Sequence, residues 1–263
     1  MKKHKQYGFV HVWLIIVACI VIGLVVFAAS RVINKKTATN TADNKTQLQT
    51  QQTQAVQKDE LELQNIGLQS FEDINYSDQA LREYSSKGLK GFYYFGDSLS
   101  GGRTNPNFEF SSTKDDAKIV AAIDGVVVFT KEQPESKDSE IFLQTSETSQ
   151  WIIGYDHIVD VLVKKGDKVK AGDVLGRAAV QNNGLRRFEF QVNKKTAGAD
   201  DLHICPTTLL AGSVKDAVTN SLKTMMDKWE STSGISTLYD TTAQNPIGCG
   251  VQTLTPAKAT GQN

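Results

Sequence analysis

The chain has 263 residues, with 29 basic and 29 acidic side chains and 40% hydrophobic residues. This length suits one domain of ordinary size with appendages. The balanced charge, without a basic stripe, excludes the electrostatic footprint of a nucleic-acid-binding protein. The three cysteines, Cys19, Cys205 and Cys249, lack the close spacing of a metal knuckle or a redox pair.

An uninterrupted apolar segment lies near the N-terminus. Residues 12–29 contain no charged side chain, and together with their neighbours they predict a transmembrane helix over residues 8–30. Three lysines in the leader, residues 1–7, favour a cytoplasmic N-terminus and an exported C-terminal part. The alternatives are a cleaved signal peptide, whose apolar region is normally shorter at about 7–15 residues, and lipoprotein cleavage at Cys19, which would leave an apolar stub.

A polar region follows the apolar segment. Residues 31–77 are rich in Thr, Gln, Asn and Lys, which predicts a stalk with little apolar surface to bury. Within this stalk, residues 47–68 are compatible with a polar helix. A short amphipathic segment over residues 78–87 leads into the folded domain.

The folded domain is predicted over residues 78–212 and is expected to be mainly β. Residues 118–130 (KIVAAIDGVVVFT) predict two apolar strands around the turn signal Asp124-Gly125. Residues 188–192 (FEFQV) alternate between apolar and polar side chains, as a strand with one wet face does. Further short strands are expected at residues 140–144, at residues 150–155, and between the Gly-Asp turns of residues 159–176.

The C-terminal region begins with an amphipathic pattern. Apolar residues at helical spacing predict a helix over residues 213–230, with Ser213 as N-cap and Asp216 completing a capping box. We expect its apolar face to dock on the β domain. Residues 231–263 predict a flexible tail. Cys205 and Cys249 are the two cysteines of the exported part, and in an oxidising compartment both the bridged and the free state are open.

Four ordered segments carry a family resemblance: residues 120–127 (VAAIDGVV), 155–157 (YDH), 163–176 (VKKGDKVKAGDVLG), and 188–206 with FEFQV and a Cys-Pro pair. Together they resemble the lysostaphin/LytM-type zinc metallopeptidases of the bacterial cell wall. The resemblance covers roughly residues 92–210. It implies a LytM-like β-sheet core of the barrel-sandwich, or duplicated hybrid motif, type.

The resemblance also indicates where a zinc site belongs. Members of this family bind zinc through a His-x-x-x-Asp pair and the second histidine of a later His-x-His. The histidine of a Tyr-x-His segment assists catalysis, together with the first histidine of the His-x-His pair. These positions fall on Asn107 and Ser111, on Arg187 and Glu189, and on His157, which alone keeps the family residue.

The substituted side chains are poorly suited to zinc. An amide and a neutral hydroxyl are weak zinc donors, and a permanently cationic arginine repels a divalent ion. We therefore expect no zinc cofactor and a degenerate member of the family. The candidate groove residues are Glu109, Tyr155, His157, Arg187 and Glu189.

A rearranged metal site is the alternative. Glu109 lies midway between the two lost ligand positions and shares their face of a strand, so the ligands of such a site would be Glu109, His157 and Glu189, with Asp97 and Asp156 in reserve. The more economical interpretation is a set of charge-paired groups in which His157 is a hydrogen-bonded remnant.

Three functions follow from these observations. The leading one is a non-catalytic, membrane-anchored envelope protein that binds peptidoglycan or a cell-wall hydrolase partner. The second is an active cell-wall metalloendopeptidase with a substituted metal site. The third is a lipoyl-like periplasmic adaptor of a transport or secretion assembly, although Lys170 is interpreted as a solvated turn lysine rather than a modified one.

Overall fold

The computed structural model describes residues 60–256. Within them, eleven strands form one sheet whose strand pairs are all antiparallel. The strands are β1 (Phe92–Tyr93), β2 (Phe108–Thr113), β3 (Lys118–Val120), β4 (Gly125–Gln133), β5 (Asp138–Gln144), β6 (Trp151–Val159), β7 (Lys168–Val169), β8 (Val174–Val180), β9 (Arg186–Lys194), β10 (Leu202–Ile204) and β11 (Thr253–Leu254). The predicted mainly β fold is confirmed.

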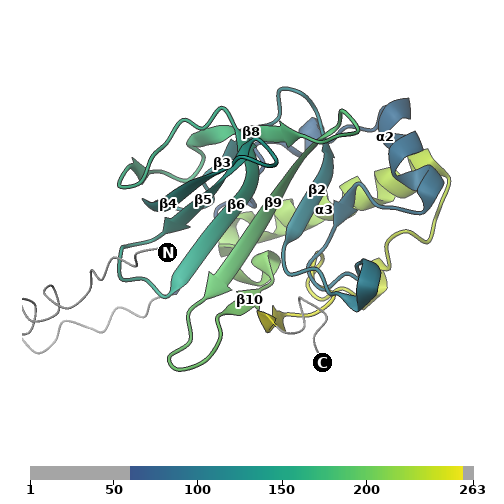
Figure 1. The fold of residues 1–263 in the computed structure, drawn as a ribbon. Helices are drawn as coiled ribbons and strands as arrows, with labels where there is room; N and C mark the ends of the chain where they lie inside the picture. Colours follow the sequence, from purple (N-terminus) through teal and green to yellow (C-terminus); the bar gives the residue numbers. More distant parts are fainter. Residues whose placement is uncertain (1–59, 257–263) are drawn as a thin grey trace, which may run out of the picture. The chain divides into compact units, whose positions relative to one another are not determined.

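The sheet order is β1-β2-β9-β8-β6-β5-β4-β7, with β3 on β8 and with β10 between β9 and β11. Strand β9 also pairs with β6, so three long strands, β2, β9 and β6, lie side by side (Figure 1). The two strands predicted around Asp124-Gly125 exist as β3 and β4, but they pair with β8 and β5 rather than with each other.

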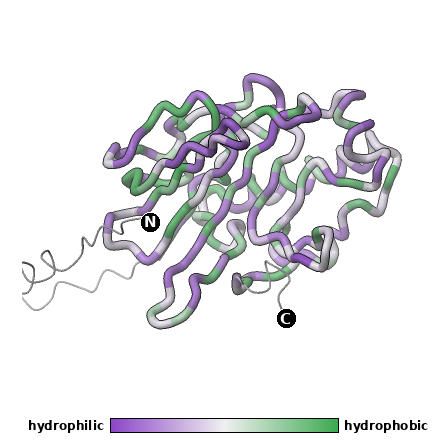
Figure 2. The backbone as a smooth tube through the Cα atoms, in the orientation of Figure 1, coloured by the Kyte–Doolittle hydropathy of each residue, from purple (hydrophilic) through white to green (hydrophobic). Residues whose placement is uncertain are grey.

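Alternation along the central strands separates an apolar face from a polar face. Phe108 and Phe110 of β2 and Phe188 and Phe190 of β9 are fully buried, and the rings of Phe110 and Phe188 stack with centroids 4.8 Å apart. The residues between them, Glu109 and Glu189, face the other side. Figure 2 shows hydrophobic and hydrophilic residues mixed along the sheet strands, as this arrangement requires.

Helix α3 (Gly212–Ser233) lies across the aromatic face of the sheet (Figure 1). It buries Leu222, Met225, Met226 and Trp229. The Trp229 side chain packs so closely on Gly91 that a Cβ there would lie 2.4 Å from its ring. The predicted amphipathic helix is present, but it is longer than expected, and its N-cap is Ala211, so the expected capping role of Ser213 is wrong.

The shorter helices lie at the edges of the sheet. Helix α2 (Asp78–Glu83) is capped by Ser77 and falls within the amphipathic segment predicted over residues 78–87. The remaining helical turns are 3-10 helices: η1 (Phe71–Asp73), η2 (Ser85–Lys87), η3 (Ser100–Gly102), η4 (Pro206–Leu209) and η5 (Thr241–Ala243).

The stalk predicted to reach residue 77 ends earlier. Leu61, Leu63, Ile66, Leu68 and Ile74 are all buried in the core, and the backbone N–H of Leu63 donates to the carbonyl of Leu209. No helix forms over the described part of residues 47–68. These apolar residues are spaced to fill gaps along an irregular segment, which is why they show neither helical nor strand periodicity.

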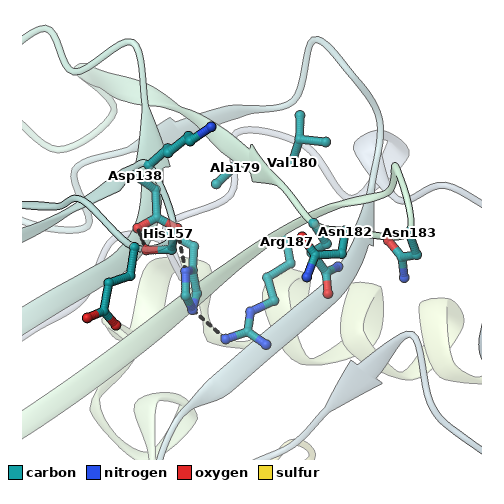
Figure 3. Close-up of a pocket in the computed structure, with 11 residues that line it drawn as sticks. Asp138, His157, Ala179, Val180, Asn182, Asn183 and Arg187 are labelled. Carbon is teal, nitrogen blue, oxygen red and sulfur yellow. Dashed lines mark hydrogen bonds and ion pairs between the residues drawn. The ribbon is translucent and has the colours of Figure 1, made fainter.

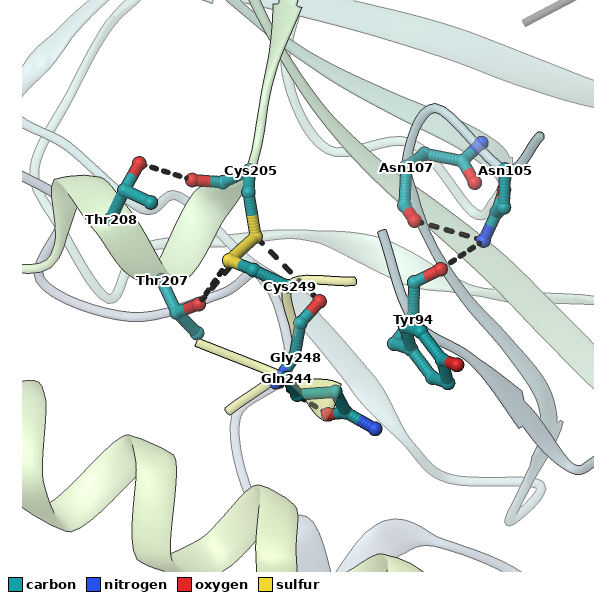
Figure 4. The surroundings of a disulfide bond; sticks show 9 residues. All are labelled: Tyr94, Asn105, Asn107, Cys205, Thr207, Thr208, Gln244, Gly248 and Cys249. Atoms are coloured by element: carbon teal, nitrogen blue, oxygen red, sulfur yellow. Dashed lines mark hydrogen bonds between the residues drawn. A yellow bond between two sulfur atoms is a disulfide. The ribbon is translucent and has the colours of Figure 1, made fainter. Parts of the chain in front are cut away.

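The tail predicted to be flexible is packed over its described part. Leu238, Tyr239 and Leu254 are buried, β11 extends the sheet, and a cis peptide bond joins Asn245 to Pro246. Cys205 and Cys249, 44 positions apart, form a disulfide bond with a Cα–Cα distance of 5.9 Å (Figure 4). The tail is thereby tied covalently to the β domain.

The predicted leader, transmembrane helix and most of the stalk lie outside the described residues. Among residues 60–256, no helix is long and apolar enough to cross a membrane.

Candidate functional site

The polar face of the sheet carries a row of three carboxylates. Glu109 of β2 pairs with Glu189 of β9, which pairs in turn with Asp156 of β6. Because directly opposed residues of antiparallel strands lie about 4.5–5.5 Å apart, the register alone gathers three negative charges. Cationic side chains close to these carboxylates are needed to offset the repulsion between the three negative charges.

His157 enters this row through an unusual backbone conformation. Its φ is +61°, a left-handed value that non-glycine residues seldom adopt. Regular alternation would place His157 on the opposite face from Asp156, but the left-handed turn brings both side chains to the polar face. There the Nδ1 of His157 lies 2.7 Å from Oδ2 of Asp138, at the start of β5.

Arg187 supplies the second cation. Its Nη2 lies 2.9 Å from Oε1 of Glu189, and its Nη1 lies 3.4 Å from Oε1 of Glu109. The same guanidinium contacts Nε2 of His157 (Figure 3). Arg187 therefore ties together three residues from three strands.

Asn107 and Ser111, the remaining positions of the family zinc site, bind to the same carboxylates. The Asn107 amide donates to Glu189, and the Ser111 hydroxyl donates to Glu109 at 2.7 Å. Both side chains are buried, and the Oδ1 atom of Asn107 has no hydrogen-bond partner. Each therefore serves as a hydrogen-bond partner of a carboxylate.

The protonation states follow from burial and from these contacts. Burial raises the pKa of Glu109, and the charge of Glu189 adds to the effect. Burial opposes ionisation of Glu189 as well, but His157 and Arg187 outweigh it and hold the pKa of Glu189 below its ordinary value. The site therefore favours ionisation of Glu189 over ionisation of Glu109.

The imidazole of His157 is expected to be charged at neutral pH. Burial alone lowers its pKa, but the contact with Glu189 and the hydrogen bond to Asp138 outweigh burial and the charge of Arg187, and raise the pKa to about 9. Nε2 of the imidazolium, 3.6 Å from Oε1 of Glu189, then shares that carboxylate with the guanidinium.

A groove of about 790 Å³ opens above His157 and Arg187. Two hairpin turns form its walls, one over residues 135–138 and one over residues 179–183. Figure 3 shows His157 and Arg187 between Asp138 on one side and Asn182 and Asn183 on the other. The site therefore has an accessible mouth and a floor of paired charges.

Five predicted residues contact one another around the Arg187 guanidinium: Asn107, Glu109, Ser111, Arg187 and Glu189, with His157 beside them. Of these six, Arg187 and His157 line the groove. Tyr155 does not join them, and its prediction as a groove residue is wrong. Its side chain is buried in the core, where its hydroxyl accepts a hydrogen bond from the Ala122 backbone N–H.

The two further acidic residues that the sequence suggests as metal ligands, Asp97 and Asp156, are bound to other groups. Asp97 is bound by Lys90, whose Nζ lies 2.6 Å from Oδ2. Asp156 accepts from Gln133 and from the His157 backbone N–H. Asp138, which orients His157, was missed, because no motif marks it and only the pairing of β5 with β6 brings it to the histidine.

The residues at the family zinc position do not fit a zinc ion. A catalytic zinc needs three good protein donors and an open position, whereas these positions offer an amide, a hydroxyl and one carboxylate. That carboxylate is already bound to a guanidinium and to an amide.

One other set of side chains has donor atoms close enough to share an ion. Among the described residues, Asp138, Asp156 and His157 offer ligand atoms within 4.8 Å of one another. However, His157 uses Nδ1 for Asp138, and its Nε2 faces a guanidinium. An ion here would have to displace an existing hydrogen bond or approach a fixed positive charge.

Comparisons with known proteins give one match to a family model, over part of the chain. Residues 108–200 match the model of "Peptidase family M23". No curated protein matches the chain.

Several solved structures are similar to this chain. The catalytic domain of the antimicrobial peptidase lysostaphin from Staphylococcus simulans is 22% identical, with 46% of this chain and 89% of that chain covered and a TM-score of 0.35. The catalytic domain of the prophage-encoded M23 protein EnpA from Enterococcus faecalis is 18% identical, with coverage of 44% and 88% and a TM-score of 0.35. The SpoIIQ-SpoIIIAH pore-forming complex contains a chain that is 18% identical, with coverage of 60% and 98% and a TM-score of 0.38.

Proposed function

We propose that this chain, which carries a Peptidase family M23 domain over residues 108–200, is a non-catalytic envelope protein that binds peptidoglycan peptides in its groove. The proposal has two parts: the absence of peptidase chemistry and the retention of a binding surface. Each part has its own support.

One observation carries the first part. The Arg187 guanidinium lies between Glu109 and Glu189, within 3.4 Å of both carboxylates. In a zinc peptidase, bound metal lowers the pKa of a water molecule and polarises the carbonyl that is attacked. Arginine remains protonated and can only donate hydrogen bonds, so it neutralises the carboxylates without supplying either a nucleophile or a Lewis acid.

The groove supports the second part. Its volume of about 790 Å³ lies within the roughly 300–1,000 Å³ that is usual for ligand sites. Gln181, Asn182 and Asn183 line one wall. The amides of Gln181 and Asn183 are bound to Tyr84, Ser111 and Leu185, whereas the exposed amide of Asn182 can both donate and accept hydrogen bonds. An extended peptide, which offers alternating N–H and C=O groups, suits such a wall.

The disulfide and the predicted anchor support an extracytoplasmic location. Disulfides persist in oxidising compartments outside the cytosol, and the bond between Cys205 and Cys249 closes a buried part of the domain. An apolar segment over residues 8–30 would hold the domain at the outer side of the membrane, where peptidoglycan is the neighbouring polymer.

Sedimentation with purified, protein-free peptidoglycan tests the proposal. The full chain should pellet with the polymer, and Val180→Arg should reduce the bound fraction, because Val180 lines the groove and is 53% exposed. Leu162→Arg is the matched control, since Leu162 is 67% exposed and lies outside the groove lining. Equal binding of all three proteins would refute a groove site. Failure of the unaltered chain to pellet would refute peptidoglycan binding and favour a hydrolase partner.

The second candidate, a peptidase with a substituted metal site, rests on the Asp138, Asp156 and His157 set. Chelator-sensitive cleavage of wall peptides that is abolished by Asp138→Asn would favour it over the binding function. The lipoyl-like adaptor has no comparable support, since Lys170 lies 3.0 Å from Asp124 in an exposed turn.

A further inference from the structure

We propose that Tyr84 is a positioning residue of the groove: its hydroxyl group holds the turn between β8 and β9, residues 181–185, so that Asn182 is presented to a bound peptide. The inference rests on the proposed function, since it names a contact through which the groove would bind a peptide. Tyr84 itself ends helix α2 and is not part of the groove lining. It would therefore act on binding only through the turn.

The Tyr84 hydroxyl makes every hydrogen bond that a phenol can make. It donates to the Ser111 carbonyl at 2.6 Å, and it accepts from Nε2 of Gln181 at 2.9 Å and from Nδ2 of Asn183 at 3.3 Å. A phenol group has one hydrogen to donate, and its oxygen can accept two hydrogen bonds. Because Tyr84 is only 7% exposed, little water can compete for these partners.

Strand β2 connects this network to the charged floor of the groove. The Ser111 carbonyl accepts from Tyr84 and also from Nε2 of Gln181, at 2.9 Å. The Ser111 hydroxyl donates to Glu109, whose carboxylate contacts the guanidinium of Arg187. The turn is therefore fixed relative to the charged side chains of the site.

The turn is held on both sides of Asn182. Its two neighbours, Gln181 and Asn183, are both bound by Tyr84. From outside the groove, Nε2 of Gln79 donates to the Asn183 carbonyl at 2.9 Å. Asn182 is exposed and lies on the groove wall beside Asn183 (Figure 3). An amide whose neighbours are already fixed can bind a peptide backbone without the cost of ordering a mobile loop.

The test compares Tyr84→Phe with Tyr76→Phe in sedimentation of the full chain with purified, protein-free peptidoglycan. Both rings pack on Trp229, and each variant removes one hydroxyl. The Tyr76 hydroxyl, however, donates to the Met225 carbonyl, and neither of these residues lines the groove. Y84F should weaken binding about threefold to tenfold, the effect of about one hydrogen bond, and Y76F should bind like the unaltered chain.

A double-mutant cycle separates positioning from a general structural effect. Asn182→Ala should itself weaken binding. Y84F/N182A should bind no more weakly than N182A, because Tyr84 acts through the amide that N182A removes. A loss in the double variant equal to the product of the two single losses would overturn the inference, and so would Y84F that binds like Y76F.

Hydrogen exchange of the turn amides is a readout that needs no ligand. The backbone N–H groups of Gln181 and Leu185 are hydrogen-bonded within the turn and should exchange faster in Y84F than in Y76F; equal exchange would overturn the inference. If Y84F does not fold, Gln79→Ala removes the other contact that holds the turn and replaces Y84F in both measurements. Failure of the unaltered chain to pellet would instead refute the proposed function, and hydrogen exchange would then decide whether Tyr84 holds the turn.

Discussion

Replacing Arg187 by methionine should destabilise the chain by leaving carboxylates buried without their counter-charge. The Arg187 side chain is 29% exposed, and the carboxylates of Glu109 and Glu189 are 16% and 19% exposed. At an effective dielectric constant of 20, a unit charge pair at about 4 Å interacts by roughly 4 kcal/mol. Removal of one partner of a buried pair typically costs about 3–5 kcal/mol. Partial exposure screens these contacts, so we expect the free energy of unfolding to fall by about 2–4 kcal/mol.

Urea denaturation followed by tryptophan fluorescence measures this loss, with the buried Trp229 of α3 as a reporter. Glu189→Gln in the Arg187→Met background should recover part of the loss, because it removes the stranded charge; the coupling energy from the double-mutant cycle should be about 1–3 kcal/mol. The control R177M breaks a pair whose side chains are 44% and 57% exposed and should cost less than about 1 kcal/mol. A loss for R187M no larger than for R177M would refute the reasoning.

Three further predictions concern other parts of the molecule. The carboxylate neighbours of His157 outweigh its burial and raise its pKa from 6.5 to about 9, so the stability that the charged imidazole contributes is complete below pH 6.5 and is lost as the pH rises through 9. His157→Gln should therefore flatten the dependence of the free energy of unfolding on pH between 6.5 and 9, measured by urea denaturation. An unchanged slope would contradict the charged state of His157. Cys249→Ser opens a disulfide that spans 44 positions and should lower stability by about 4 kcal/mol in the chain-entropy model; an unchanged melting temperature would show that the bridge is not closed in solution. Gly91→Ala would place a Cβ 2.4 Å from Trp229 and should lower the free energy of unfolding by about 1–3 kcal/mol. The control Gly212→Ala has open space around the added Cβ and should leave the thermal midpoint unchanged or raised. Equal midpoints for the two variants would show that α3 does not pack on Gly91.

The strands were predictable because their signals are local. The alternation of residues 188–192 and the turn at Asp124-Gly125 depend on a few neighbouring residues, and both appear in the structure. The packing of Leu61 and Ile74 was not predictable in this way, because isolated apolar residues in a polar segment show no period. Their burial depends on distant strands that supply the other side of each contact.

The sequence predicts most of the residues of the candidate site, but not the contacts that they make. Family spacing alone located Arg187 and Glu189, which share a strand. Tyr155 was misplaced because strict alternation would give Tyr155 and His157 the same face, and the left-handed conformation of His157 breaks that rule. Asp138 was missed because its contact with His157 depends on how β5 pairs with β6.

The central claim is that the groove lacks peptidase chemistry, and one measurement tests it most directly. The full chain, supplied with excess zinc, is incubated with peptidoglycan stem peptides and their cross-bridged forms, and the newly released amino groups are counted. Because Arg187 neutralises the carboxylates at the family metal position, amine release should not exceed that of the peptides alone. Release that requires zinc, is stopped by a chelator and disappears in Glu189→Gln would contradict the account.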